Sequence, residues 1–246
     1  EFPGERPPVL WMIEEAGAKQ IAVDTLDANL LAPARASLTR LDLVDHAKPE
    51  RAVKDGAELG LIREAARFAD MVLERLLGMG GDIIQQGGTE ADLLGDSTGH
   101  VRKLLSATHG EAFQGTQTRI TASVHSGSRA ALPHGSVTAR HPLPGDPIVA
   151  GIGCSLGGYH AESGVTFVLG EIHPEQRRVM EAMAEAGAAT VHALEQGWTC
   201  SKVNEAALAP IRGAGLADSI RHRIGHGMGV EGHEAPWLAP GDHTPT

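Results

Sequence analysis

The segment 147–169 constrains the fold most strongly, because β-compatible residues flank a glycine-rich centre at 153–158. This pattern predicts a β-hairpin. If the chain turns at residues 156–157, Gly151 and Glu162 lie equally far from the turn and face each other across the ladder. A carboxylate at both positions would form a clamp for cations, and this chain has only the one at Glu162.

Two amphipathic helices are predicted before the hairpin. Apolar residues recur every three or four positions over 59–76, a spacing that places one stripe against a core. Asp55 and Glu58 form the pattern of a capping box at its start, and Gly78 predicts its end. A second helix is predicted to begin at Thr89.

The chain after the hairpin continues with mixed elements. A helix is predicted from Pro174 to Gly197, followed by another from about residue 199 that Pro210 bends or stops. A glycine- and histidine-rich strand region is predicted over 213–230. Helices mixed with hairpins favour an α+β fold over repeated βαβ units.

The beginning of the chain has a different character. A helix followed by two short apolar strands before residue 45 is typical of the end of an α/β unit. The charged, proline-containing stretch 47–55 indicates a connector. We therefore divide the chain near Lys54, into 1–54 and 55–246.

Composition excludes several classes of protein. Thirty-one acidic and 21 basic residues give a net charge of -10, so no basic field is present to hold a nucleic-acid backbone. The apolar stretches are far shorter than the roughly 20 residues of a membrane span, and nothing at the N-terminus resembles a signal peptide. Cys154 and Cys200 are too few for a disulfide framework. We expect a cytoplasmic protein that binds neither nucleic acid nor membrane.

Histidine is the most informative excess, with 13 residues, because imidazole serves acid–base chemistry and metal ligation near neutral pH. His222, His226 and His233 are spaced by four and then seven positions along a glycine-rich stretch. Spacing alone leaves open a binding site or a structural strand. Polar groups interrupt an apolar or glycine-rich pattern in four segments: 132–135, 150–162, 222–229 and 231–236.

Five motifs follow one another in order: LPHG (132–135), GDPIVAGIG (145–153), GYHAESGVTFVLGE (158–171), GHGMG (225–229) and HEAP (233–236). The ordered set resembles the pita-bread superfamily (M24) of creatinase and methionine aminopeptidase, and within it most closely the Xaa-Pro dipeptidases (prolidases) and aminopeptidase P. The resemblance implies an α+β pita-bread catalytic domain over 55–246, with 1–54 as the end of the N-terminal α/β domain and a linker. It also implies a homodimer.

The resemblance implies a metal site as well. The family places aspartates at the positions of Gly151 and Glu162 and a histidine at His226, all as ligands of a two-metal centre. It thus implies that Glu162 and His226 hold a divalent metal (Mn, Co or Zn) in a site altered at Gly151, and a metal-free state stays open. The family's two further ligands are glutamates in later strands. No motif before Thr246 matches them, so we expect C-terminal strands outside this sequence.

Three histidines are implied to act on the substrate. His134 and His233 match the family's two non-ligand active-site histidines, which contact substrate and move protons around the tetrahedral intermediate. His222 is expected to bind substrate in the same pocket. Arg223 and Glu234 are two further charges that could face a substrate.

The function implied is a prolidase-like peptidase that hydrolyses Xaa-Pro bonds in small peptides with proline at the second position. One alternative is a metal-independent pita-bread hydrolase of a small C–N substrate with His134 as acid and base. The other is a protein without activity whose pocket binds peptides or a protein partner. Gly164 stands where the creatinase branch has a glutamate, which argues against creatine.

Overall fold

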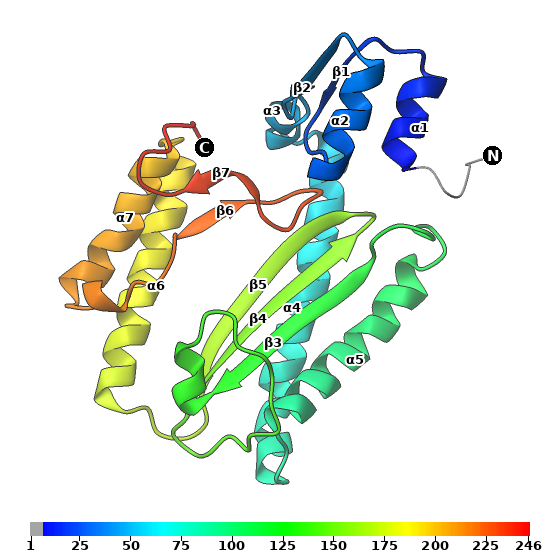
Figure 1. The fold of residues 1–246 in the computed structure, drawn as a ribbon. Coiled ribbons are helices and arrows are strands. Elements are labelled where there is room, and N and C mark those ends of the chain that lie inside the picture. The colour runs from blue at the N-terminus through cyan, green and yellow to red at the C-terminus, as the bar shows by residue number, and fades with distance from the viewer. Residues whose placement is uncertain (1–6) are drawn as a thin grey trace. The chain divides into compact units, whose positions relative to one another are not determined.

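The structure, a computed structural model, describes residues 7–246 (Figure 1). The chain divides into two compact units, 1–53 and 54–246. Within the described residues, no helix is both long enough and apolar enough to cross a membrane.

The first unit is a small α/β arrangement. Its elements are α1 (Pro8–Glu15), β1 (Gln20–Val23), α2 (Ala28–Ser37), β2 (Arg40–Leu43) and α3 (Lys48–Ala52). Strands β1 and β2 pair in parallel, and α2 makes the crossover that a parallel pair requires. The helix and two strands predicted before residue 45 are present, and the predicted connector contains the short helix α3.

The second unit begins with the two predicted long helices, α4 (Gly56–Gln85) and α5 (Glu90–His109). Each starts with a capping box, at Asp55 and at Thr89. In this arrangement the capping side chain accepts from a backbone N–H of the first turn, and an acidic side chain three residues on accepts in return. Both helix starts are therefore where the sequence predicts them.

The prediction that Gly78 ends the first of these helices was wrong. Helix α4 continues for about two further turns to Gln85. Gly80 is buried in this continuation, and Ile83 and Ile84 pack against the buried cluster that contains Leu76. Burial of these side chains outweighs the roughly 1 kcal/mol that a glycine costs inside a helix.

The predicted hairpin is the centre of a three-stranded antiparallel sheet. Strands β3 (Arg119–Ser126), β4 (Pro147–Leu156) and β5 (Tyr159–Val168) lie in that order. The turn between β4 and β5 is formed by Gly157 and Gly158, which have φ angles of 60° and 90°. Two consecutive positive φ angles match the right-handed twist of the flanking strands and favour glycine at both positions.

The predicted register of the hairpin was wrong. Because the turn is at Gly157 and Gly158, Gly151 pairs with Gly164, and Glu162 pairs with Gly153. Gly151 and Glu162 are thus diagonal neighbours rather than direct partners. They still share a face of the sheet, because residues two apart along a strand point the same way.

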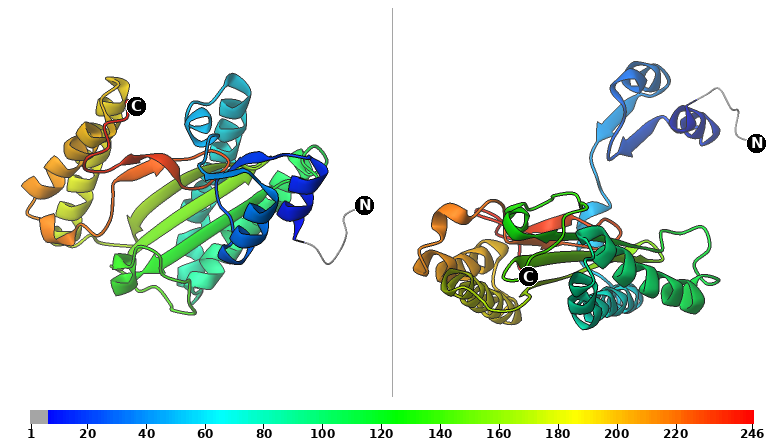
Figure 2. Two further views of the ribbon diagram at one scale, coloured as in Figure 1. Left: turned by 45° about the horizontal axis from the view of Figure 1, so that its top comes forward. Right: turned by 90° about the horizontal axis from the view of Figure 1, so that it is seen from below.

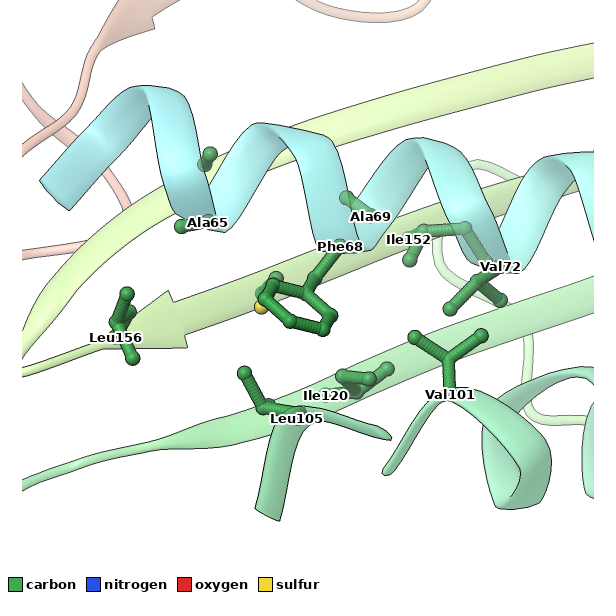
Figure 3. Packing of buried hydrophobic residues seen from close by; sticks show 11 residues of the cluster. Ala65, Phe68, Ala69, Val72, Val101, Leu105, Ile120, Ile152 and Leu156 are labelled. Carbon is green, nitrogen blue, oxygen red and sulfur yellow. The ribbon is translucent and has the colours of Figure 1, made fainter. Parts of the chain in front are cut away.

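Helices α4 and α5 cover one face of this sheet, while the C-terminal segment passes over the other (Figure 2). The core lies between helices and sheet, where Phe68 of α4 packs among aliphatic side chains such as Val101, Ile120 and Ile152 (Figure 3). Cys154 belongs to the same cluster, and burial raises the pKa of its thiol to about 11. This cysteine behaves as a small apolar residue.

The remaining helices form a pair. Helix α6 (Pro174–Glu195) packs on α7 (Cys200–Gly213), with Ala186 buried against Leu208 and Ile211. Helix α7 continues past Pro210 to Gly213, so Pro210 does not stop it, and Ile211 directly after the proline is buried. Single-turn 3-10 helices lie at η1 (Gly127–Ala131) and η2 (Ala217–Ser219).

The strand region predicted over 213–230 is mostly irregular. Only β6 (Gly225–Gly227) forms there, and it pairs antiparallel with β7 (Glu234–Leu238). A register shift between His226 and Gly227 interrupts this ladder. Glycine-rich sequence weakens strand formation because it offers no side chains to pack.

Glu64 of α4 links the two long helices and makes their packing sensitive to pH. Its Oε1 atom accepts hydrogen bonds from Nη2 of Arg67 at 2.7 Å and from Nε2 of His109 at 2.8 Å. The bonds from Arg67 and then from His109 lower the pKa of this carboxyl from 4.5 to about 2. The stabilisation that Glu64 provides is therefore complete above about pH 4.5 and is lost as the pH falls toward 2.

We expect the difference in free energy of unfolding between the wild type and Glu64→Gln to shrink as the pH falls from 4.5 to 2. Urea unfolding followed by circular dichroism over this range measures it. Glu74→Gln, which removes an exposed carboxylate of the same helix, serves as the matched control. A constant difference for Glu64→Gln would contradict the assignment.

Candidate active site

A cleft of about 580 Å³ lies on the sheet face opposite to helices α4 and α5. Its floor comes from residues of the hairpin, with Gly151, Gly153 and Glu162 on one face. All five residues predicted to act in the site line this one cleft: His134, Glu162, His222, His226 and His233. They come from four separate segments of the chain.

The four histidines of the cleft lie in two pairs. The ring centroids of His226 and His233 are 4.1 Å apart, and those of His134 and His222 are 6.3 Å apart. His233, which the resemblance implies to act on substrate, thus lies beside the implied metal ligand His226. His134 has His222 as its histidine neighbour.

Glu162, His226 and His233 form a group that suits a metal ion, because one ligand atom from each lies within 4.8 Å of the others. Nδ1 of His226 is 3.0 Å from the carbonyl oxygen of Gly227. A carbonyl oxygen only accepts, so Nδ1 carries the hydrogen and leaves the lone pair on Nε2. That Nε2 atom is 3.7 Å from Oε2 of Glu162.

Glycines in the GHGMG motif allow this grouping. A Cβ atom on Gly227 would lie 2.7 Å from the carbonyl oxygen of Ala235, which excludes any larger residue beside β7. A Cβ atom on Gly229 would lie 2.7 Å from Oε1 of Glu234. The close approach of β7 to β6 brings His233 next to His226.

Glu234 does not face the cleft. Its Oε1 atom is 2.5 Å from Nζ of Lys54, and the two side chains are only 5% and 11% exposed. Its Oε2 atom accepts from the backbone N–H of Glu231 at 3.3 Å. This buried ion pair holds the loop that carries His233, so Glu234 has a structural partner and Arg223 alone remains of the two charges considered above.

A family comparison identifies the chain. The model of the metallopeptidase family M24 matches residues 60–246. The chain belongs to metallopeptidase family M24. Enzymes of this family typically use divalent metals, which agrees with the group formed by Glu162, His226 and His233.

Individual relatives are named as dipeptidases or probable dipeptidases. The chain is 31% identical over 194 residues to the probable dipeptidase PepE of Mycobacterium tuberculosis, covering 78% of this chain and 48% of that protein. It is 28% identical over 200 residues to the Xaa-Pro dipeptidase of Pyrococcus furiosus, covering 81% and 54%. The chain thus spans about half the length of these relatives.

Solved structures confirm the α+β pita-bread fold. The crystal structure of dipeptidase PepE from Mycobacterium ulcerans matches with a TM-score of 0.80 at 25% identity, covering 100% of this chain and 64% of that chain. The prolidase from Pyrococcus furiosus matches with a TM-score of 0.80 at 24% identity, covering 96% of this chain and 67% of that chain.

Sequence reasoning missed one buried carboxylate that organises this M24 site. Glu90 is fully buried, and its oxygens accept from the backbone N–H and hydroxyl of Ser126, both at 2.8 Å. They also accept from the backbone N–H and hydroxyl of Thr138, at 3.1 and 2.8 Å. Burial raises the pKa of Glu90, but these hydrogen bonds outweigh it and hold the pKa below its ordinary value. Only its place in the first turn of α5 could have drawn attention to it.

These contacts hold the loop that carries His134. Nη1 of Arg140, at the end of this loop, donates to Oγ of Ser126 and to Oδ2 of Asp146, both at 2.7 Å. Arg129 donates to the carbonyl of Ser136, within the loop. Glu90 and two arginines thus fix the loop 127–140, and with it the position of His134 in the cleft.

We expect Glu90→Gln to loosen this loop, because the amide nitrogen of glutamine cannot accept from Ser126 or Thr138. An unsatisfied buried donor costs about 1–3 kcal/mol. Hydrogen exchange of the backbone amides in 127–140 should become faster. Glu111→Gln, an exposed carboxylate just after the same helix, makes the same chemical change away from the loop, and it should leave that exchange unchanged. Equal exchange in both variants would contradict the role given to Glu90.

Proposed function

We propose that this chain forms the substrate cleft and one metal subsite of a hydrolase that cuts Xaa-Pro bonds, with a metal centre altered at Gly151. The observation that carries the proposal is the group of Glu162, His226 and His233 in one cleft with His134. The M24 family and relatives named as dipeptidases support the same chemistry.

The donor set fits one divalent ion. A carboxylate with imidazoles suits Mn, Co and Zn, and the donor atoms are close enough for a single ion to draw them together. Gly151 offers no side-chain donor, so these residues do not supply the carboxylate that a second, bridged ion requires. When bound, a divalent ion lowers the pKa of a coordinated water and polarises a carbonyl oxygen.

The protein's own residues supply positioning and proton transfer. Attack on a peptide carbonyl builds negative charge on its oxygen and requires a proton on the leaving nitrogen, and an imidazole can meet either need near neutral pH. His134 holds this role in the proposal, with His222 beside it on the substrate side. Glu162 and His226 act as ligands, and the position of His233 allows it to join them or to move protons.

Gly151 favours a second candidate function. A cleft that has lost a metal carboxylate can still bind a peptide, because its shape and its histidines remain. In that case the protein would be a peptide-binding member of M24 without hydrolytic activity. Peptide binding without hydrolysis in the presence of Mn, Co or Zn would select this function.

The proposed function is tested first with His226→Ala. We expect the purified wild type to bind about one divalent ion per chain and to hydrolyse Ala-Pro when Mn, Co or Zn is added. His226→Ala should weaken metal binding, measured by calorimetry, by more than about tenfold, and should abolish hydrolysis. His100→Ala, an exposed histidine of α5, is the control. Full hydrolysis in His226→Ala would exclude the proposal.

Gly151→Asp tests whether the site is altered by one missing carboxylate. A Cβ atom at this position meets only Oγ of Ser123, at 3.4 Å, so the cleft has room for the new side chain. We expect the number of bound divalent ions to rise from about one toward two. Gly187→Asp, an exposed site on α6 with open space, adds the same charge away from the cleft and should change nothing. Unchanged metal stoichiometry in Gly151→Asp would show that another feature limits the site.

A further inference from the structure

His125 is a buried histidine that the proposed chemistry does not use. It is 2% exposed and is not among the residues that line the cleft. It lies on β3 two residues after Ser123, which does line the cleft, so both side chains leave the same face of the sheet. A buried imidazole carries polar nitrogens, and such groups are retained where they have a hydrogen-bond partner.

The partner of His125 is the residue directly after His134. Nε2 of His125 donates a hydrogen bond to the carbonyl oxygen of Gly135, and Nε2 carries the hydrogen because a carbonyl oxygen only accepts. A Cβ atom on Gly135 would lie 3.1 Å from this Nε2 and 3.4 Å from two further ring atoms. The backbone of Gly135 therefore lies directly against the imidazole, and the glycine of the LPHG motif permits this contact.

This hydrogen bond connects a rigid element to the loop. The backbone of His125 pairs with Val149 in the β3–β4 ladder, so the donor is fixed by the central sheet. The other side-chain contacts of the loop, described above, act at positions 136 and 138. The contact from His125 acts one residue after His134. A shift of Gly135 is therefore passed to the backbone of His134 through a single peptide bond.

We propose that His125 is a positioning residue for the reaction, and that its Nε2–H holds Gly135 so that the His134 imidazole keeps its place in the cleft. This inference rests on the proposed function, in which His134 transfers protons to and from the substrate. Misplacing a reacting group by about 1 Å can cost on the order of a hundredfold in rate. His125 acts through the backbone of the loop and needs no contact with the substrate.

The test compares two substitutions of His125. His125→Leu removes the donor and keeps an apolar side chain of moderate size, whereas His125→Gln keeps an N–H donor. His100→Leu makes the first change at an exposed histidine of α5 and is the matched control. Two-bond 15N–1H spectra of the histidine rings report the environment of His134 without any reaction, and a His134→Gln spectrum assigns its signals. Hydrolysis of Ala-Pro gives kcat and KM, and calorimetry gives the affinity for the divalent ion.

We expect His125→Leu to shift or broaden the ring signals of His134. It should lower kcat and kcat/KM equally, by about tenfold or more, because the lost interaction matters only in the transition state. The affinity for the divalent ion should stay unchanged. His125→Gln should restore most of the rate and the wild-type ring signals, and His100→Leu should change neither.

Gly135→Ala tests the same contact with His125 intact, and it decides the question if His125→Leu does not fold. Its Cβ atom presses on the imidazole, so the ring signals of His134 should change and kcat should fall. Gly95→Ala, at an exposed position of α5 with open space, is its control.

Unchanged ring signals and an unchanged kcat in His125→Leu, or in Gly135→Ala where that variant decides, would overturn the inference and leave the proposed function intact. Equal losses in His125→Leu and His125→Gln would overturn the role of the hydrogen bond. A wild type that does not hydrolyse Ala-Pro would overturn the proposed function and, with it, the catalytic part of the inference. The ring spectra would then decide by themselves whether His125 positions His134.

Discussion

One face of the sheet β3–β4–β5 is packed against helices α4 and α5, and this packing determines where chemistry can occur. Side chains alternate along a strand, so burying Ala150 and Ile152 against the helices turns Gly151 and Glu162 toward the cleft. A slip of one residue would exchange the faces and bury the Glu162 carboxylate in the core, at a large cost in free energy. Apolar packing therefore places the carboxylate of Glu162 in the cleft.

The cleft is completed by loops, and buried charges hold them. Lys54 with Glu234 fixes the loop of His233, and Glu90 fixes the loop of His134. Taking such groups out of water is costly, and the cost is offset only where each oxygen finds donors. Glu90 meets this condition with four hydrogen bonds from two residues. The stability of the site thus depends on polar groups that do not line the cleft.

Much of this arrangement could be predicted from the sequence. It is encoded by patterns within a few residues, or by motifs that follow one another in a recognisable order. The capping boxes at Asp55 and Thr89 are determined within four residues, and the hairpin follows from its glycines. Its register was off because the chain could turn at either of two neighbouring positions. The partners of Glu90 are 36 and 48 residues away, and Lys54 is 180 residues from Glu234. No local pattern encodes such pairs, so only the folded chain reveals them.

Neither the backbone conformation nor the packing at position 151 requires a glycine. Its φ angle is not positive, unlike that of Gly157, and a Cβ atom would fit, unlike at Gly227. The backbone therefore does not require glycine here. In the metal site that we propose, the effect of Gly151 is chemical, because a glycine offers no carboxylate. Of the three described donors, two are imidazoles, and such a set suits Zn or Co better than Mn, which prefers oxygen ligands.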